Sequence, residues 1–587
     1  MNARFSRPCS CVALSLAAVF VLTMHASSQT PAQHLKLTEL ATGQNPEKDL
    51  ARWQSSFLPD GRWRTLKLQA QAEEGTLPVP SGRVLWAGLF PEALLKESGK
   101  GVQVVGKLDA VEELNALGHP PAVLPVPPGI NVASHMQWTA FGVEERVQPV
   151  VEEQDGEWKI TEGQKPAGLY SAALWRLPSW PRRAAWKVDL TLKGQGEIEI
   201  GLSADTGKGF GDPPSLRRIS LTPEGIPVSL KVPAAWNSAK ALRLNLVTVP
   251  KGTRDLSVAS VTWKPEGTSK PKGGSAPPRL PLGVWDWSAK PELWLKKQVA
   301  WKDAGLSVLQ LALPQGSETE SAKTALSELK TAGFSIVAVE GDPHMILPGE
   351  RKTVVQRHKQ LGETAAGLLA GVQYDVEPYL LPGFRLQPAR WYQQWAELYG
   401  EISASSKMRA EAVVPFWLLG QEHGQSLLQK LAGSSRRVVV MNYRSDLVEA
   451  TSWGTLWLEW GARHEHPVSL AVECGPISDT PVRTFRAAKD GDGKGRLWID
   501  RWEGQGTAVV IYEDPVSAGE TGTVLTETRE SVVSGDKTTM QHRPPEDVKA
   551  LLQSLEGLAA KMSLPASVKP VLLLHEPAEA VLENLSR

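Results

Sequence analysis

Two carboxylates separated by one residue, Asp375 and Glu377, are the side chains of this sequence best placed to do chemistry. They end the segment Gly371–Tyr379 (GVQYDVEPY), whose apolar beginning predicts a short buried strand. Side chains alternate along a strand, so both acids are expected on one face. Pro378 has no N–H to give to a sheet and should end the strand. Burying two acids costs free energy, which favours a functional pair over a structural pair satisfied by neighbouring donors.

Strands and helices alternate after residue 281, and this order predicts a (β/α)8 barrel that positions the two acids. A doubly wound open sheet is the competing fold, but it needs fewer strands, and the sequence has no Gly-rich phosphate loop. The expected barrel strands are Leu282–Trp287, Ser307–Leu313, Ser335–Glu340, Gly371–Glu377, Arg409–Phe416, Arg437–Tyr443, Val468–Glu473 and Thr507–Tyr512.

Acids and aromatic residues gather at the carboxyl ends of these strands, where barrels of this kind carry their function. Acids exchange protons and aromatic rings stack on sugar faces, so this combination suits the hydrolysis of glycosidic bonds. We expect Asp375, Glu377 and Glu473 to be catalytic. The expected substrate-binding residues are Asp286, Trp287, Tyr379, Trp417, Asn442, Tyr443, Arg444 and Tyr512.

The region resembles chitinase-like glycoside hydrolases, whose fourth strand ends in Asp-x-Asp-x-Glu and whose sixth carries Met-x-Tyr-Asp. Gln373-Tyr374-Asp375-Val376-Glu377 matches the last two acids, and Met441-Asn442-Tyr443-Arg444 matches Met and Tyr. The resemblance implies that Glu377 is the general acid and that Asp375 and Tyr443 hold an acetamido group. Gln373 and Arg444 depart from the pattern and leave the acetamido chemistry open.

The same strands are similar to a second group of barrel glycosidases, which carry the acid/base on strand four and the nucleophile on strand seven. Glu377 and Glu473 hold those two places, although Val376 stands where that group has Asn. The resemblance implies that Glu473 is the nucleophile or second carboxylate. An ion pair between Glu473 and Arg444 across the barrel is the alternative. Cys474 should face the helices as a small buried thiol.

The N-terminal half has a different pattern from the barrel region. Short alternating strands at 151–265, separated by Gly, Pro and Asn turns, predict an antiparallel β-sandwich that resembles carbohydrate-binding modules. Residues 35–150 are expected to be a mixed, β-rich region, with a helix at Val111–Leu117. A linker rich in Pro, Gly and Ser covers 266–280, the barrel covers 281–565, and 566–587 is expected to be a C-terminal tail.

The first residues predict a secretory signal at 1–28, because a basic start is followed by an apolar run and small residues. We therefore expect a secreted or periplasmic protein that does not stay in the membrane after signal removal. Of the 3 cysteines, Cys9 and Cys11 lie in this signal, so Cys474 has no disulfide partner in the mature chain. The formal net charge is +0, and no basic stretch, P-loop or zinc-type spacing indicates nucleic acid, a metal or another cofactor.

These observations predict a multidomain protein with a mostly β N-terminal region and a C-terminal TIM barrel. The expected function is that of a glycoside hydrolase acting on a polysaccharide or oligosaccharide. A non-catalytic carbohydrate-binding protein on the same barrel is the first alternative, motivated by Gln373 and Arg444. A scaffold or envelope protein whose N-terminal region carries the function is the second. The sequence does not decide the oligomeric state.

Overall fold

The computed structural model describes most of the chain after residue 279 and part of what precedes it. The described C-terminal ranges are 279–487, 495–502, 506–512 and 522–586, with short gaps at 315–318, 366, 382–383 and 385–387. Upstream, the described ranges are 34–39, 54–57, 63–69, 76–78, 84–90, 95–96, 98–108, 110–117, 122–142, 147–149, 158–160, 166–249 except 182–183, and 255–266. The predicted signal at 1–28 and most of the predicted linker at 266–280 lie outside the described residues.

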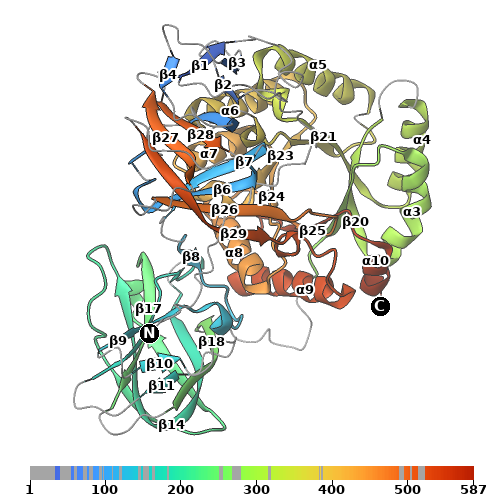
Figure 1. The fold of residues 1–587 in the computed structure, drawn as a ribbon. Helices are drawn as coiled ribbons and strands as arrows, with labels where there is room; N and C mark the ends of the chain where they lie inside the picture. Colours follow the sequence, from blue (N-terminus) through green and yellow to red (C-terminus); the bar gives the residue numbers. More distant parts are fainter. Residues whose placement is uncertain are drawn as a thin grey trace.

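A closed barrel of parallel strands with helices around it forms the C-terminal half (Figure 1), which confirms the predicted fold class. Its strands, in spatial order, are β19 (Leu282–Asp286), β20 (Leu306–Ala312), β21 (Ser335–Gly341), β22 (Gly371–Asp375), β23 (Ala410–Pro415), β24 (Arg437–Met441), β25 (Val468–Glu473) and β30 (Val571–His575). The surrounding helices are α3 (Pro291–Asp303), α4 (Thr319–Thr331), α5 (Pro348–Thr364), α6 (Pro388–Ser405), α7 (Gly424–Ser434), α8 (Leu447–His464), α9 (Pro545–Met562) and α10 (Glu579–Ser586).

Alternation along the barrel strands divides their apolar side chains between two cores. The inner core lies inside the barrel and includes Trp285, Val339, Val413, Val439 and Leu573. The outer core lies between the strands and the helices and is larger. This division determines which residues at the strand ends can reach the mouth of the barrel.

The prediction of the eighth barrel strand is wrong. Thr507–Tyr512 lies in β28 (Gly506–Tyr512) of a separate seven-stranded sheet, and β30 closes the barrel instead. β30 falls within 566–587, the segment predicted to be a C-terminal tail. Periodicity finds strands but does not show which of two apolar strands closes a barrel, because closure depends on pairing between distant segments.

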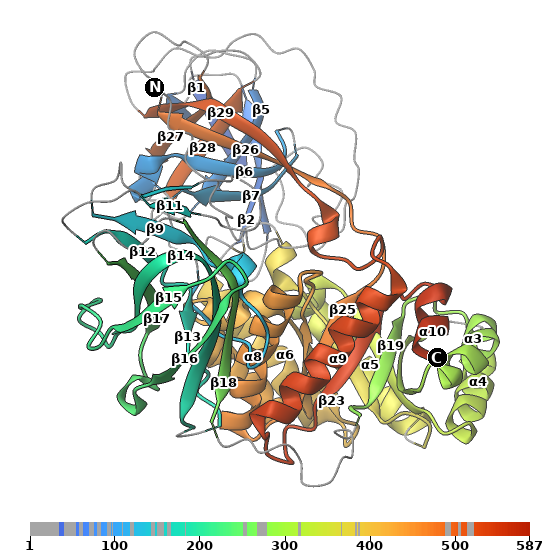
Figure 2. The same cartoon turned by 90° about the horizontal axis from the view of Figure 1, so that it is seen from below.

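The seven-stranded sheet joins two distant parts of the chain (Figure 2). The segment between β25 and α9 contributes β26 (Thr480–Ala487), β27 (Gly495–Trp502), β28 and β29 (Thr523–Val533). The N-terminal region contributes β5 (Val84–Phe90), β6 (Val102–Lys107) and β7 (Ala110–Ala116). The helix expected at Val111–Leu117 is therefore wrong, because this segment pairs as a strand with β6.

The predicted β-sandwich is built around one long strand, β14 (Trp186–Asp205). Its first half pairs with β18 (Asp255–Pro265) and β16 (Ile226–Val232), and its second half pairs with β17 (Ala241–Thr248) and β15 (Arg217–Leu221). Inward residues from both halves form one core. The strands β8 (Leu124–Pro125), β9 (Trp138–Phe141) and β10 (Val147–Pro149) belong to the same connected strand system, so it begins before residue 151.

The sandwich docks on barrel helix α8 through a buried ion pair. Arg176 donates from both guanidinium Nη atoms to Glu459, at 2.8 and 3.3 Å, and the Ser179 N–H also donates to this carboxylate. The Glu459 side chain is fully buried. At the start of α8, Asp446 pairs with His135 at 2.9 Å, and Val448 packs into the sandwich core. Sandwich and barrel therefore meet through the buried Glu459 carboxylate, a partly exposed ion pair at Asp446 and an apolar contact at Val448.

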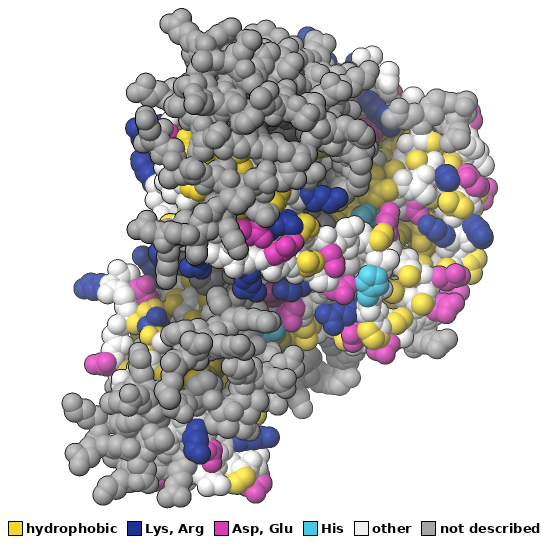
Figure 3. Space-filling model, viewed as in Figure 1, with side chains coloured by type: hydrophobic (Ala, Val, Ile, Leu, Met, Phe, Trp, Pro, Cys, Tyr) yellow, Lys and Arg dark blue, Asp and Glu magenta, His cyan; other side chains and the backbone are white. Residues whose placement is uncertain are grey.

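Side chains of both charge signs are interspersed on the described part of the face in Figure 3. Lys and Arg lie beside Asp and Glu over the barrel helices at the right of that view. This mixing matches the balanced formal charge of the sequence.

Replacing Glu459 with Ala is expected to lower the free energy of unfolding by about 3 kcal/mol, because it leaves the Arg176 guanidinium without its partner. Urea unfolding followed by tryptophan fluorescence measures the loss. Glu328→Ala is the matched control, since Glu328 is exposed on α4. Equal stability of the two variants would contradict the docking role of Glu459.

Candidate active site

The two acids of the opening motif lie at the mouth of the barrel, but their backbone differs from the prediction. β22 ends at Asp375, and Glu377 adopts a left-handed conformation with φ 45° and ψ 51°. A residue before proline is usually extended, and a left-handed non-glycine residue costs about 1 kcal/mol. The turn starts the short helix η7 (Pro378–Leu380) directly after Glu377. Backbone strain of this kind is commonly found at functional sites.

Aromatic side chains surround the acids. The Tyr379 hydroxyl donates a hydrogen bond to Oε1 of Glu377, and the Tyr379 ring meets Trp417 edge-on at 5.0 Å between centroids. Trp287 approaches the backbone of Gly341: a Cβ added there would lie 3.0 Å from the Trp287 ring and 3.1 Å from Cβ of Asp375. The absence of a side chain at Gly341 thus lets Trp287 and Asp375 come close together.

Both acids have raised pKa values. Burial raises the pKa of Glu377 from 4.5 to about 7, although the Tyr379 hydrogen bond and nearby His575 act in the opposite direction. Burial, followed by the charge of Glu377, raises the pKa of Asp375 well above its usual range. Oδ1 of Asp375 is shielded from solvent and has no hydrogen-bond partner among the described residues. A carboxyl with a pKa near 7 can donate a proton at neutral pH, which is what a general acid requires.

Glu473 is paired with a histidine that the sequence analysis missed. Its Oε2 lies 2.6 Å from Nδ1 of His575, the last residue of β30, and its Oε1 accepts the Gly475 N–H at 2.7 Å. Burial alone would lower the pKa of His575, but the hydrogen bond and charge of Glu473 outweigh it, so this pKa is raised. The predicted alternative, an ion pair between Glu473 and Arg444, is wrong: Arg444 pairs with Glu449 at 3.3 Å.

Tyr443 lies near both groups of site residues, the acids Asp375 and Glu377 and the pair of Glu473 and His575. Its ring lies nearly parallel to that of His575, at 8° and 6.1 Å between centroids. Burial, with the charges of Glu473, Asp375 and Glu377, raises the pKa of its hydroxyl well above 10. Tyr443 therefore lies within the electrostatic field of all three acids predicted to be catalytic.

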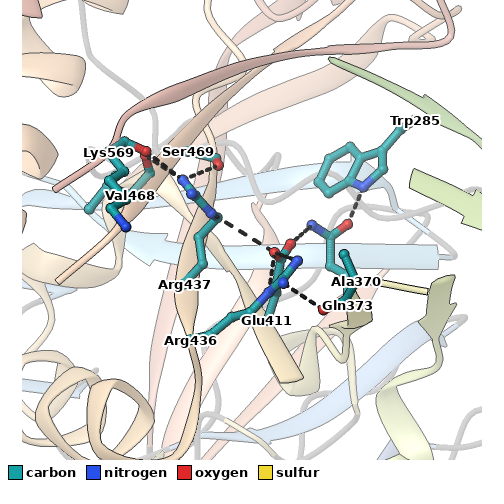
Figure 4. A network of polar contacts seen from close by, with 9 residues as sticks. All are labelled: Trp285, Ala370, Gln373, Glu411, Arg436, Arg437, Val468, Ser469 and Lys569. Carbon is teal, nitrogen blue, oxygen red and sulfur yellow. Dashed lines mark hydrogen bonds and ion pairs between the residues drawn. The ribbon is translucent and has the colours of Figure 1, made fainter. Parts of the chain in front are cut away.

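A polar network inside the barrel supports this mouth from below (Figure 4). The Trp285 indole N–H donates to Oε1 of Gln373, and the Gln373 amide donates to Glu411 at 3.3 Å. Glu411 in turn pairs with Arg436 at 2.7 Å. Gln373 stands where the chitinase-like pattern has Asp. An amide can accept from Trp285 and donate to Glu411 at the same time, whereas an ionised carboxylate in its place could only accept.

Four predicted substrate-binding residues have other contacts. Asp286 pairs with Lys297 of α3 at 2.6 Å, and Asn442 donates to the carbonyl of Ala450 in α8 at 3.0 Å. Arg444 lies 4.1 Å from the centroid of the Phe416 ring, and Tyr512 belongs to the separate seven-stranded sheet. The motif spacing placed these residues near strand ends but did not show which face each would take.

His575 was not predicted as part of the site, whereas Trp285 was predicted to stack on a sugar or to fill space in the barrel. Trp285 meets the His575 ring edge-on at 5.6 Å, and it also belongs to the inner core. The signal for His575 was the apolar run Val571–Leu574 ending in a histidine, which has the form of a barrel strand with a polar end. Cys474 faces the outer core and is buried, as expected, and burial raises its pKa.

Within the described ranges, no set of three or more His, Cys, Asp or Glu side chains is arranged to hold a metal ion. In the same part of the chain, no helix combines the length and apolar character that crossing a bilayer requires.

No family model and no curated protein matches this chain. Among solved structures, it is similar to the CBM22-1–GH10 modules of Clostridium thermocellum endo-1,4-beta-D-xylanase 10B, with 10% identity over 63% of this chain and 83% of the other, at a TM-score of 0.23. A GH113 beta-1,4-mannanase has 11% identity over 52% and 97%, at 0.28. The glycoside hydrolase domain of Pseudomonas aeruginosa PelA has 12% identity over 33% and 85%, at 0.24. Structural similarity at such low TM-scores does not support a conclusion about this chain. The assignment of the fold therefore rests on the strand order of the closed barrel.

Replacing Gln373 with Glu is expected to lower the free energy of unfolding at pH 7 by about 1–3 kcal/mol, because it removes a donor and sets a second carboxyl against Glu411. Urea unfolding measures this change. Gln360→Glu on the exposed side of α5 is the control for the added acid. Wild-type stability of the Gln373 variant would contradict the bridging role of the amide.

The raised pKa of Glu377 gives a pH dependence of stability with a definite sign. Between pH 4.5 and about 7 the folded state keeps a proton that the unfolded state releases, so stability falls as the pH rises. Glu377→Gln should remove this loss, and relative to wild type it should gain at most about 3 kcal/mol between pH 4.5 and pH 8. Urea titrations at several pH values measure the difference. A constant difference across this range would contradict the raised pKa.

Proposed function

We propose that this protein is a glycoside hydrolase that acts on a polysaccharide or oligosaccharide, with Glu377 as general acid. The observation that carries the proposal is a half-buried carboxyl with a pKa of about 7, at the mouth of a (β/α)8 barrel and beside a second half-buried acid. Glycosidic oxygens are poor leaving groups until they are protonated, and a carboxyl that stays protonated near neutral pH can supply that proton.

The aromatic side chains around the acids support a sugar as the substrate. Trp287 lies near Asp375 and Tyr379 contacts Glu377, while Trp417 packs edge-on against Tyr379 from the outer core. The flat faces of such rings suit the apolar faces of sugars. The mouth therefore combines a proton donor with surfaces that could hold a pyranose ring.

The reaction that follows is the addition of water across the bond between the anomeric carbon and the glycosidic oxygen. Glu377 gives its proton to the leaving oxygen as that bond breaks, and water supplies the new oxygen at the anomeric carbon. The proton released by water restores the carboxyl pair. Asp375, whose Oδ1 has no partner within the described chain, is the residue we assign to support the substrate next to Glu377.

A non-catalytic carbohydrate-binding protein is the second candidate, and one observation favours it. Both oxygens of Glu473 are engaged, by the Gly475 N–H and by His575, and the side chain is buried. The acid predicted as nucleophile or second carboxylate is thus not free. A protein of this kind would bind glycans at the mouth without releasing reducing ends.

The proposed setting is outside the cytoplasm, either secreted or periplasmic. It rests on the signal-like sequence at 1–28, which lies outside the described residues. N-terminal sequencing of the mature protein tests it.

Glu377→Gln is expected to lower the release of reducing ends by about 100-fold or more, because general acid catalysis commonly contributes a factor of 10² to 10⁴. Wild-type kcat/KM should fall above about pH 7, where Glu377 loses its proton. The assay uses a panel of bacterial and plant polysaccharides, and circular dichroism checks the fold of each variant.

The control is Glu363→Gln, an exposed position on α5. Release by wild type and this control alone would support the hydrolase. Release by the Glu377 variant at the wild-type rate would overturn the assignment of the acid. Glycan binding by wild type without release would favour the second candidate.

A further inference from the structure

The Glu473 carboxylate holds His575 in one orientation at the mouth of the barrel. The Glu473 carboxylate accepts from Gly475 at 2.7 Å with one oxygen and faces Nδ1 of His575 at 2.6 Å with the other. A carboxylate can only accept, so Nδ1 carries a proton and the second ring nitrogen, Nε2, points away from Glu473. Glu473 thus fixes both the position and the tautomer of the imidazole, as a carboxylate does in many functional histidine pairs.

Two aromatic rings fix the plane of the imidazole. Tyr443 lies nearly parallel to it, and Trp285 meets it edge-on at 5.6 Å. Trp285 is itself tied to Gln373 by its indole N–H, so the network below the mouth extends to His575. Three contacts, with Glu473, Tyr443 and Trp285, therefore orient this one histidine.

Nε2 of His575 has no hydrogen-bond partner within the residues that the structure describes, and it is shielded from solvent. The His575 side chain as a whole is 20% exposed, so the ring lies at the edge of the mouth. Leaving a buried nitrogen unpaired costs free energy, and a partner supplied by a bound molecule would recover it. Tyr379, which is hydrogen-bonded to Glu377, packs against the same inner core as Trp285 and Tyr443, the two rings that contact His575.

We propose that His575 is a substrate-contacting residue of this site, whose Nε2 forms a hydrogen bond with a sugar hydroxyl next to the bond that Glu377 protonates. The proposal rests on the proposed hydrolase function. A hydroxyl is the matching group because it both donates and accepts, so it pairs with the neutral imidazole and with the imidazolium. In this arrangement Glu473 acts through His575 as a positioning residue and not as a nucleophile.

Two amide substitutions separate the two nitrogens of His575. The amide of Asn lies near the place of Nδ1, so His575→Asn retains a donor to Glu473 and loses the group at Nε2. The amide of Gln reaches nearer to Nε2, so His575→Gln restores a polar group there. We expect a fall in kcat/KM of about 10- to 100-fold for His575→Asn, and a smaller fall for His575→Gln. A purely structural histidine would give the reverse order, because only Asn keeps the bond to Glu473.

The measurements use the hexaoses of β-1,4-linked glucose, mannose, xylose and N-acetylglucosamine and a polysaccharide panel, with wild type, both His575 variants and Glu377→Gln side by side. Binding is followed by tryptophan fluorescence and cleavage by reducing-end release. Loss in His575→Asn with partial retention in His575→Gln supports the proposal. Wild-type binding and turnover by His575→Asn, or a greater loss in His575→Gln, overturns it.

The same experiment distinguishes this proposal from the proposed function. If Glu377→Gln remains active while His575→Asn does not, the assignment of the acid fails and the contact through His575 stands. If wild type binds a glycan without cleaving it, the hydrolase fails, and weaker binding by His575→Asn still supports the contact. If wild type neither binds nor cleaves any member of the panel, both proposals are overturned.

Discussion

The parallel pairing of β30 with both β25 and β19 closes the barrel, and the site depends on this closure. Val571–His575 lies beside Ser469–Glu473 on one side and Leu282–Trp285 on the other. Because these pairings fix the register, His575 lies opposite both Glu473 and Trp285. Residues 102 positions apart in sequence thereby form a hydrogen bond at the mouth. Without β30, the buried Glu473 carboxylate would keep only the Gly475 N–H as a partner, and Trp285 would lose the ring that it meets.

Closure of the barrel also shields the two acids at its mouth partly from solvent, which favours their protonated forms. Inside the mouth, burial is the largest cause of the raised pKa values of Asp375, Glu377 and Tyr443. The raised pKa values of the two acids, Asp375 and Glu377, cost stability at neutral pH, as does the left-handed backbone of Glu377. The buried network through Gln373 and Glu411 supports this costly region from below. The two acids with raised pKa values and the left-handed backbone of Glu377 thus lie together at the mouth of the barrel.

The sequence allowed the first seven barrel strands to be predicted because each is an apolar run separated from the next by a helix of ordinary length. It also located Asp375, Glu377, Tyr379 and Tyr443, since two-residue alternation and proline are local signals. The eighth strand could not be chosen locally: Thr507–Tyr512 and Val571–His575 are both apolar, and only long-range pairing distinguishes them. For the same reason His575 was missed and Tyr512 was wrongly placed. The contacts of Arg444 and Asn442 with α8 could not be predicted either, because no motif specifies them.

The central physical claim is that burial keeps the Glu377 carboxyl protonated near neutral pH. Carbon-13 NMR of glutamate side-chain carboxyls reports this directly, with the Glu377 signal assigned by its disappearance in Glu377→Gln. A titration midpoint near pH 7 is expected for Glu377. A midpoint near 4.5, the ordinary value of a glutamate, would contradict the account and remove the basis for acid catalysis at this site.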